Sequence, residues 1–147
     1  MNEPEPTLQS LCARRPRLLR IEAVRGRGGL GGEAFSELAL GFDAARLRIW
    51  APHDAAHLGC EVGDDPLSRD PEDAREEEPW WRVMGSPLIG AWITRGKPDL
   101  PVELALQLRE DASSPRIISL ARERTHIRVR WEPKERWEAR VQAHRPE

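Results

Sequence analysis

The stretch VELALQLR, residues 102–109, shows most clearly what kind of fold to expect. Its large apolar side chains occupy every second position from Val102 to Leu108, and the positions between them hold polar residues or alanine. Successive side chains of a strand point to opposite faces, so this stretch predicts a strand with one buried and one solvated face. Such strands are typical of antiparallel sheets.

The same period of two recurs along the chain, with turn-forming sequences between the blocks. The further blocks are Leu19, Ile21 and Ala23; Leu38, Leu40 and Phe42; Leu47, Ile49 and Ala51; Leu58, Cys60 and Val62; Ile89, Ala91 and Ile93; and Ile127, Val129 and Trp131. The pattern predicts a mainly β (or α+β) fold of about six to eight strands. We expect a single antiparallel sheet, arranged as a meander, a half-open barrel or a small sandwich, with one or two short helices.

Several segments fit this pattern less well. Residues 1–16 are polar and contain prolines, which predicts a loose N-terminal arm or a short helix before a single domain over residues 17–147. Residues 33–40 fit a helix or a strand, and so do residues 133–147 at the C-terminal end. An acidic loop is expected over residues 61–79.

Composition excludes several classes of protein. The 147 residues allow one domain, and a net charge of −2 argues against strong steering toward nucleic acid or an anionic membrane. The N-terminal stretch has no signal-peptide pattern, and the longest uncharged run is too short for a membrane helix. Two distant cysteines do not form a disulfide framework. We therefore expect a cytoplasmic protein without a membrane segment and without a cofactor.

Tryptophan is the main aromatic residue, with six Trp, two Phe and no Tyr. Trp131 is in phase with Ile127 and Val129, which places it in the core. Trp50 and Trp92 are out of phase with the aliphatic residues of their strands. Something apolar must therefore cover part of the second face: the C-terminal segment, a partner protein or a second copy of the chain.

The glycine-rich stretch RGRGGLG, residues 25–31, satisfies the pattern G-x-G-x-x-G of a dinucleotide-binding turn. That turn requires a buried parallel strand before it and a helix after it. The preceding strand carries Arg20 and Glu22, and no alternation of strands and helices follows. A flexible hairpin loop is the better interpretation.

A metal site is one alternative. His53 and His57 are four residues apart with Asp54 between them, and Cys60 follows. Two histidines at this spacing on a helix can share a metal ion, and a nearby acid can act on the bound water. This set predicts a metal-dependent hydrolase or a metal-binding protein. Between two strands, however, a polar loop is expected in any case.

The acidic segment, residues 61–78, contains nine acidic residues and two arginines, and Pro79, Trp80 and Trp81 follow it. Such a run is usually a solvated loop, and the tryptophans can anchor it to the core. Aromatic residues beside dense negative charge also suit a protein interface. The expected partner-binding residues are Asp70, Glu72, Asp73, Glu76, Glu77, Glu78, Trp80 and Trp81.

A basic stripe is a further alternative. Arg124, Arg128 and Arg130 share one side of the last clear strand with His126, and cations at this spacing can follow a phosphate backbone. No aromatic residue lies among them for base stacking. Pairing with Glu103 on a neighbouring strand, or screening by the acidic loop, explains them without nucleic acid.

No nucleophile motif stands out, so the sequence favours a non-catalytic protein-binding module with a basic partner. A compact, mildly acidic domain of this kind is typical of bacterial toxin-neutralising immunity proteins and operon-encoded adaptors. A homo-oligomer also stays open, because Trp50 and Trp92 can face a second copy. This function is a hypothesis by analogy with a class of proteins, because one fold can carry many functions.

Overall fold

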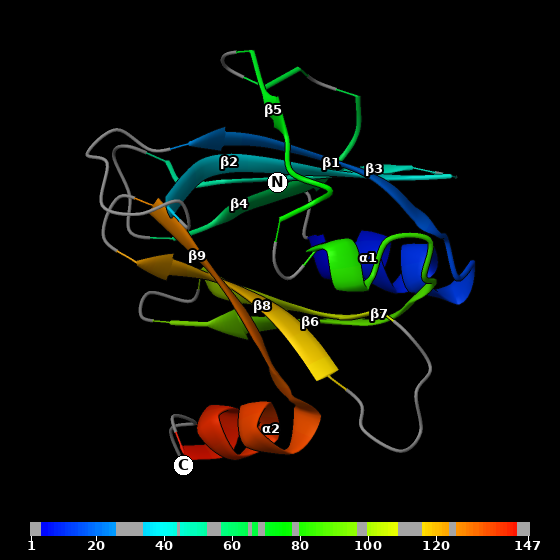
Figure 1. The fold of residues 1–147 in the computed structure, drawn as a ribbon. Helices are drawn as coiled ribbons and strands as arrows, with labels where there is room; N and C mark the ends of the chain where they lie inside the picture. The colour runs from blue at the N-terminus through cyan, green and yellow to red at the C-terminus, as the bar shows by residue number, and fades with distance from the viewer. Residues whose placement is uncertain are drawn as a thin grey trace.

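The computed structural model describes residues 4–25, 34–43, 45–52, 57–64, 66–67, 70–77, 80–96, 100–108, 116–123 and 126–143. Its elements, shown in Figure 1, are α1 (Pro4–Ala13), β1 (Leu18–Arg25), β2 (Ala34–Phe42), β3 (Arg46–Trp50), β4 (Gly59–Val62), β5 (Glu72–Asp73), the 3-10 helix η1 (Trp80–Arg82), β6 (Leu88–Arg95), β7 (Pro101–Leu108), β8 (Arg116–Glu123), β9 (His126–Pro133) and α2 (Lys134–Ala143). Neither α-helix of the described part of the chain is long and apolar enough to cross a membrane.

One antiparallel sheet curls into a half-barrel, which is one of the arrangements that the sequence predicts, and it has nine strands where about six to eight were expected. Strands β1 to β4 form one half, and strands β6 to β9 form the other. The halves join where Phe35 of β2 pairs with Ile127 of β9. Figure 1 shows the two halves facing each other across the core.

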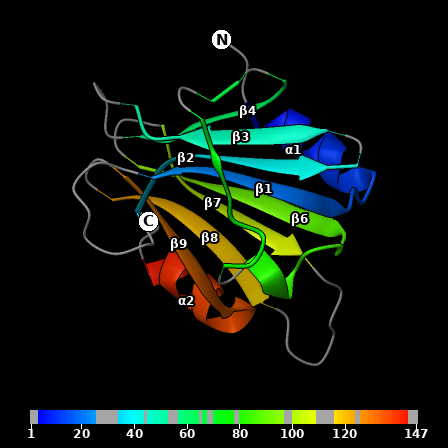
Figure 2. The ribbon, with the colours of Figure 1, turned by 45° about the horizontal axis from the view of Figure 1, so that its top comes forward.

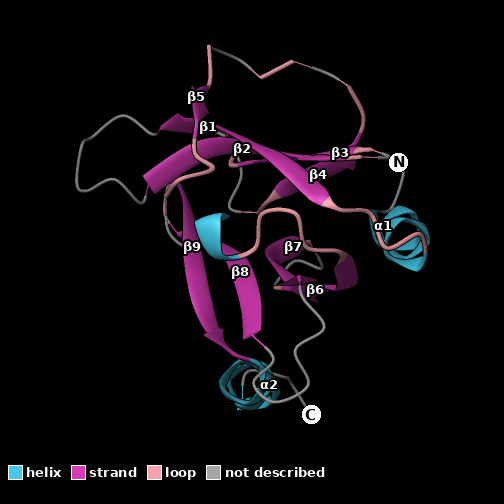
Figure 3. Ribbon diagram, turned by 45° about the vertical axis from the view of Figure 1, so that its right-hand side comes forward, coloured by secondary structure: helices cyan, strands magenta, loops and turns pink. Residues whose placement is uncertain are grey.

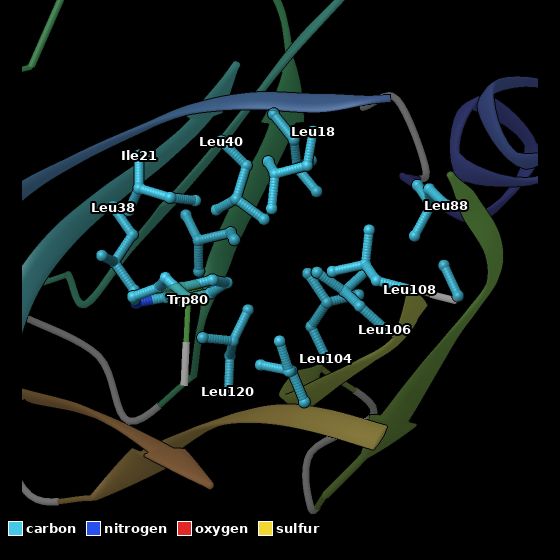
Figure 4. Packing of buried hydrophobic residues seen from close by; sticks show 14 of the residues in the cluster. Leu18, Ile21, Leu38, Leu40, Trp80, Leu88, Leu104, Leu106, Leu108 and Leu120 are labelled. Carbon is cyan, nitrogen blue, oxygen red and sulfur yellow. The ribbon is translucent and has the colours of Figure 1, made fainter. Parts of the chain in front are cut away.

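The expected alternation places the core between the two halves. The core-facing side chains of β2 and β3 include Leu38, Leu40, Leu47 and Ile49, and their cross-strand pairing puts them on one face. Figure 4 shows leucines of both halves meeting in this space. Residues 34–42 are therefore a strand, which decides between the two alternatives for that segment. Trp131 packs against the same cluster.

Helix α1 lies against β4 and β6, so the N-terminal segment is not a loose arm. Leu8, Leu11 and Cys12 are buried in the main core. Their spacing of three and four residues gives the helix one apolar face, and burial of that face stabilises it. The short-helix alternative is the one observed.

The C-terminal segment forms helix α2, which covers the outer face of the β6–β9 half (Figure 3). The Trp137 ring centroid lies 5.1 Å from that of Trp92. Of the alternatives for covering Trp50 and Trp92, the C-terminal segment is the one observed for Trp92. Trp50 is covered differently: its ring lies on Gly59, where a Cβ would come within 2.0 Å, and the Arg48 guanidinium lies 4.4 Å from its centroid.

Two features differ from the sequence pattern. Strand β8 shows no clean alternation because both of its faces are buried: Ile118 and Leu120 face the main core, and Ile117 packs with Trp137. Leu19 is 52% exposed instead of buried. A register shift between Leu18 and Arg20 turns the Leu19 side chain away from the core.

Candidate functional site

The acidic segment docks on the edge of β1 before it enters η1. Glu72 and Asp73 pair with Ala23 and Glu22 of β1, and the Ala74 N–H donates a hydrogen bond to the Ile21 carbonyl at 3.0 Å. Figure 2 shows the chain from β5 to η1 running from the β1–β4 half toward the β6–β9 half. The segment is thus tied to one half and leads into the space between both.

A compact turn fixes one charge of this segment. The backbone N–H and Nε of Arg75 donate hydrogen bonds to Asp73 Oδ1 at 3.0 and 3.1 Å, and Arg75 Nη2 lies 2.8 Å from Asp73 Oδ2. The hydrogen bonds from Arg75, first from its side chain and then from its backbone, lower the pKa of Asp73. The two charges largely neutralise each other.

Trp80 and Trp81 face opposite ways, which corrects one part of the predicted interface. Trp80 is fully buried, and Figure 4 shows it among the core leucines. It anchors the segment to the core and is not available to a partner. Trp81 is 52% exposed, with the Arg82 guanidinium 4.5 Å from its ring centroid.

The exposed Trp81 and Leu19 line the same open groove of about 560 Å³. The other residues along this Leu19–Trp81 groove are Leu18, Arg75, Glu76, Met84 and Gly85. Backbone hydrogen bonds hold its walls together: Leu18 N–H to the Ser86 carbonyl at 3.0 Å, and Gly85 N–H to the Leu18 carbonyl at 2.7 Å. Gly85 has φ of 80°, a conformation that favours glycine.

The acidic residues predicted to bind a partner lie beside this groove or along the segment that leads to it. Asp70, Glu72, Asp73 and Glu76 are exposed and Glu77 is half-buried, whereas Glu78 lies outside the described residues. The sequence pointed to the acidic segment and Trp81. The sequence did not point to Leu19. A register shift exposes this residue, and such a shift cannot be seen in the alternation of apolar and polar residues.

The predicted metal ligands are only partly described. His53 and Asp54 lie outside the described residues. Cys60 pairs with Ile49 on the core face of β4; burial, and to a lesser extent the charge of Glu61, raise its pKa to about 12. Metals bind the thiolate, so this environment disfavours ligation. The described part of the chain holds no group of three His, Cys, Asp or Glu that could bind a metal ion.

The predicted arginine stripe is also only partly described, because Arg124 lies outside the described residues. Arg128 is exposed and pairs with Glu123 across the β8–β9 hairpin at 3.2 Å, and Arg130 is half-buried. The expected pairing with Glu103 is wrong, because Glu103 binds Arg140 of α2.

A buried cluster under α2 was not predicted. Arg140 donates to Glu103 Oε2 at 3.0 Å and Oε1 at 2.9 Å, and it also binds Glu132, which lies 3.5 Å from the Ser119 hydroxyl. The hydrogen bond to Glu103 is the main cause that raises the pKa of Arg140. The cluster joins α2 to β7 and β9. Its parts lie far apart in the sequence, so no local pattern could reveal it.

Comparison with protein-family models, with curated proteins and with solved structures gives no match for this chain.

Proposed function

We propose that this protein is a non-catalytic protein-binding module that binds a basic partner at the Leu19–Trp81 groove and the adjoining acidic segment. The observation that carries the proposal is the convergence of Leu19 and Trp81. They are the two large hydrophobic residues exposed in the described part of the chain, and both line one groove. Clustered exposed apolar residues, an aromatic among them, are characteristic of interaction sites.

Charge supports the choice of partner. The acidic segment has a net charge of −7 in the sequence, and its described carboxylates at Asp70, Glu72 and Glu76 are exposed. Such a segment attracts a basic surface and speeds association, while the desolvated apolar residues slow dissociation. A toxin-neutralising immunity protein or an adaptor works in this way.

The proposal is tested by affinity capture from the native cell lysate with four baits. These are the natural protein, Trp81→Ala, the double variant Glu76→Lys and Glu77→Lys, and a control double variant, Glu135→Lys and Glu138→Lys, on α2. We expect the natural protein and the control to retain the same basic protein. Trp81→Ala is expected to lose it by faster dissociation, and the segment variant by slower, less salt-dependent association.

The α2 variant distinguishes an effect of the binding site from an effect of total charge, because both double variants change the net charge of the protein equally. A partner retained equally by all four baits would contradict the proposal. So would a partner lost equally with both charge variants.

A further inference from the structure

We propose that the free edge of strand β6 is a second binding site, which takes an extended, uncharged peptide segment of another protein as one more strand of the sheet. The site is a pocket of about 290 Å³ between α1, β6 and α2, called here the β6-edge pocket. It goes beyond the proposed function, because among the described residues it shares no lining residue with the Leu19–Trp81 groove.

Strand β6 ends its half of the sheet, with β7 on one side and no strand on the other in the described part of the chain. The chain before β1 covers the start of this edge, where the Leu88 N–H donates a hydrogen bond to the Pro16 carbonyl at 2.8 Å. Further along, α1 packs beside β6, and α2 covers its outer face (Figure 3). The edge around Ile93 opens into the pocket between the two helices.

The backbone of Ile93 directs its polar groups out of this edge. The side-chain amide of Gln9 on α1 donates a hydrogen bond to the Ala91 carbonyl at 3.2 Å, so this carbonyl faces away from β7. Residues two apart in an antiparallel strand direct their N–H and carbonyl to the same side. The N–H and carbonyl of Ile93 therefore face the edge too, and the described residues offer neither of them a partner there.

The Gln9 contact shows that this edge accepts an amide from outside the sheet. An added antiparallel strand would continue the pattern at Ile93 with two hydrogen bonds, one from its own N–H and one to its own carbonyl. Binding by strand addition gains affinity from such main-chain bonds and specificity from the side chains at alternate positions.

The walls of the pocket define the side chains that fit. The Trp92 ring lies over Gly90, where a Cβ would come within 2.6 Å, and it packs on Trp137. Val141 of α2 extends this apolar wall, and Leu8 of α1 adds to it from the other helix. No charged residue of the described chain lines the pocket. Every second residue of an added strand would face the tryptophans, so an apolar residue suits that position.

The two helices favour a single segment over a second copy of the chain. Pairing between two sheet edges requires an exposed, flat edge strand. Here α1 and α2 both line the pocket beside the edge, which leaves little room for a second sheet. The volume of about 290 Å³ is near the lower limit of about 300 Å³ for ligand pockets, so the occupant is short.

The test titrates blocked tripeptides into the protein labelled with ¹⁵N-isoleucine. The parent probe is the peptide acetyl-valine-alanine-valine-amide. Two isomers of it carry one N-methyl group each, on the alanine nitrogen or on the nitrogen of the last valine. An Ile93→Val variant assigns the Ile93 amide signal by its absence.

We expect the parent peptide to shift the Ile93 amide signal and to slow its hydrogen exchange, without dependence on salt. Successive N–H groups of a strand point to opposite sides, so only one of the two N-methyl groups faces β6. That isomer should bind about threefold to tenfold more weakly than the other, which corresponds to the loss of one hydrogen bond.

Val141→Arg introduces a long charged side chain into the pocket and should abolish the shift. Ala139→Arg is the matched control, because Ala139 is exposed on the same helix. Circular dichroism verifies that both variants fold. The comparison of the two N-methyl isomers uses the natural protein, so it stands even if Val141→Arg does not fold.

Three results would overturn the proposal. Equal binding of the two isomers would show an apolar pocket without strand pairing. No shift of the Ile93 signal with any of the peptides would show that the edge takes no such segment. A natural protein that sediments as a dimer, with Val141→Arg a monomer, would show that a second copy occupies the edge.

Discussion

Trp80 and Trp81 are neighbours in the sequence with opposite environments. Three residues complete a turn of a 3-10 helix, so successive side chains point about 120° apart. Trp80 enters the core and Trp81 lies at the groove. One short turn therefore both anchors the acidic segment and presents its aromatic contact.

Truncation of these two residues should affect stability very differently. Trp80→Ala removes a fully buried indole and is expected to cost about 3–5 kcal/mol of unfolding free energy. Trp81→Ala removes a half-exposed ring and should cost about 1 kcal/mol or less. Urea unfolding followed by circular dichroism measures both. Equal losses would contradict the assignment of Trp80 as the anchor.

Trp80→Phe provides a finer control. The Trp80 indole N–H is buried with no hydrogen-bond partner among the described residues. Phenylalanine keeps most of the apolar contact and removes this unsatisfied donor, so we expect a loss of about 1–2 kcal/mol. A loss as large as that of Trp80→Ala would mean that the indole N–H binds a water molecule or another acceptor.

At the scale of elements, α2 is held on the sheet by one aromatic contact and one charged cluster. Trp137 packs on Trp92, and Arg140 binds Glu103 and Glu132. Both glutamates are buried, so their charges depend on the arginine. Removal of that arginine leaves two carboxylates without compensation.

Arg140→Ala should therefore destabilise the protein by about 2–4 kcal/mol. The sequence pattern does not distinguish Arg140 from the other arginines of the same helix. Arg136→Ala is the control, because Arg136 lies exposed on the same helix. Its expected effect is within about 0.5 kcal/mol. Chemical denaturation compares the two variants. The role of the cluster would be disproved by equal stabilities.

The elements also show what a period of two can and cannot predict. It located β7 and β2 by their core-facing residues, but the outer face expected to be solvated is buried as well, at Glu103 and Ala105 of β7 and at Glu37 and Ala39 of β2. It missed β8, where Ile117 and Ile118 are buried on opposite faces. A period of two cannot indicate α1, for which a short helix was one of two alternatives, and the spacing of Leu8, Leu11 and Cys12 is the helical signal that favours it.

At the scale of the whole molecule, the half-barrel was predictable and its closure was not. Alternation specifies which face of each strand is buried, and this implies a curved or doubled sheet. It does not specify that Trp80 and α1 fill the open side between the halves. The candidate groove depends on that closure, so only its acidic and aromatic parts could be found from the sequence.

Stability at high pH should depend on Cys60. The thiol ionises near its ordinary pKa of 9.0 in the unfolded chain, and burial raises the pKa to about 12 in the folded protein. The folded state thus favours the protonated thiol. The resulting stability is fully present below pH 9 and decreases as pH rises toward 12, by up to about 1.4 kcal/mol per pH unit.

The measurement compares the pH dependence of unfolding for the natural protein and Cys60→Ala between pH 9 and 11. The variant should show a flatter dependence, whatever its loss of packing energy at neutral pH. The chain has no tyrosine, so few other groups titrate in this window. If unfolding free energy depended on pH in the same way for both proteins, Cys60 would not be the source of the high-pH loss of stability.

The junction of the two halves also has a consequence for the expected order of folding. Within each half, strands pair with neighbours along the chain, and such short loops close at low entropic cost. The pairing of Phe35 with Ile127 instead joins distant segments. We therefore expect the two meanders to form first and their union, which completes the core around Trp80, to be the slowest step of folding.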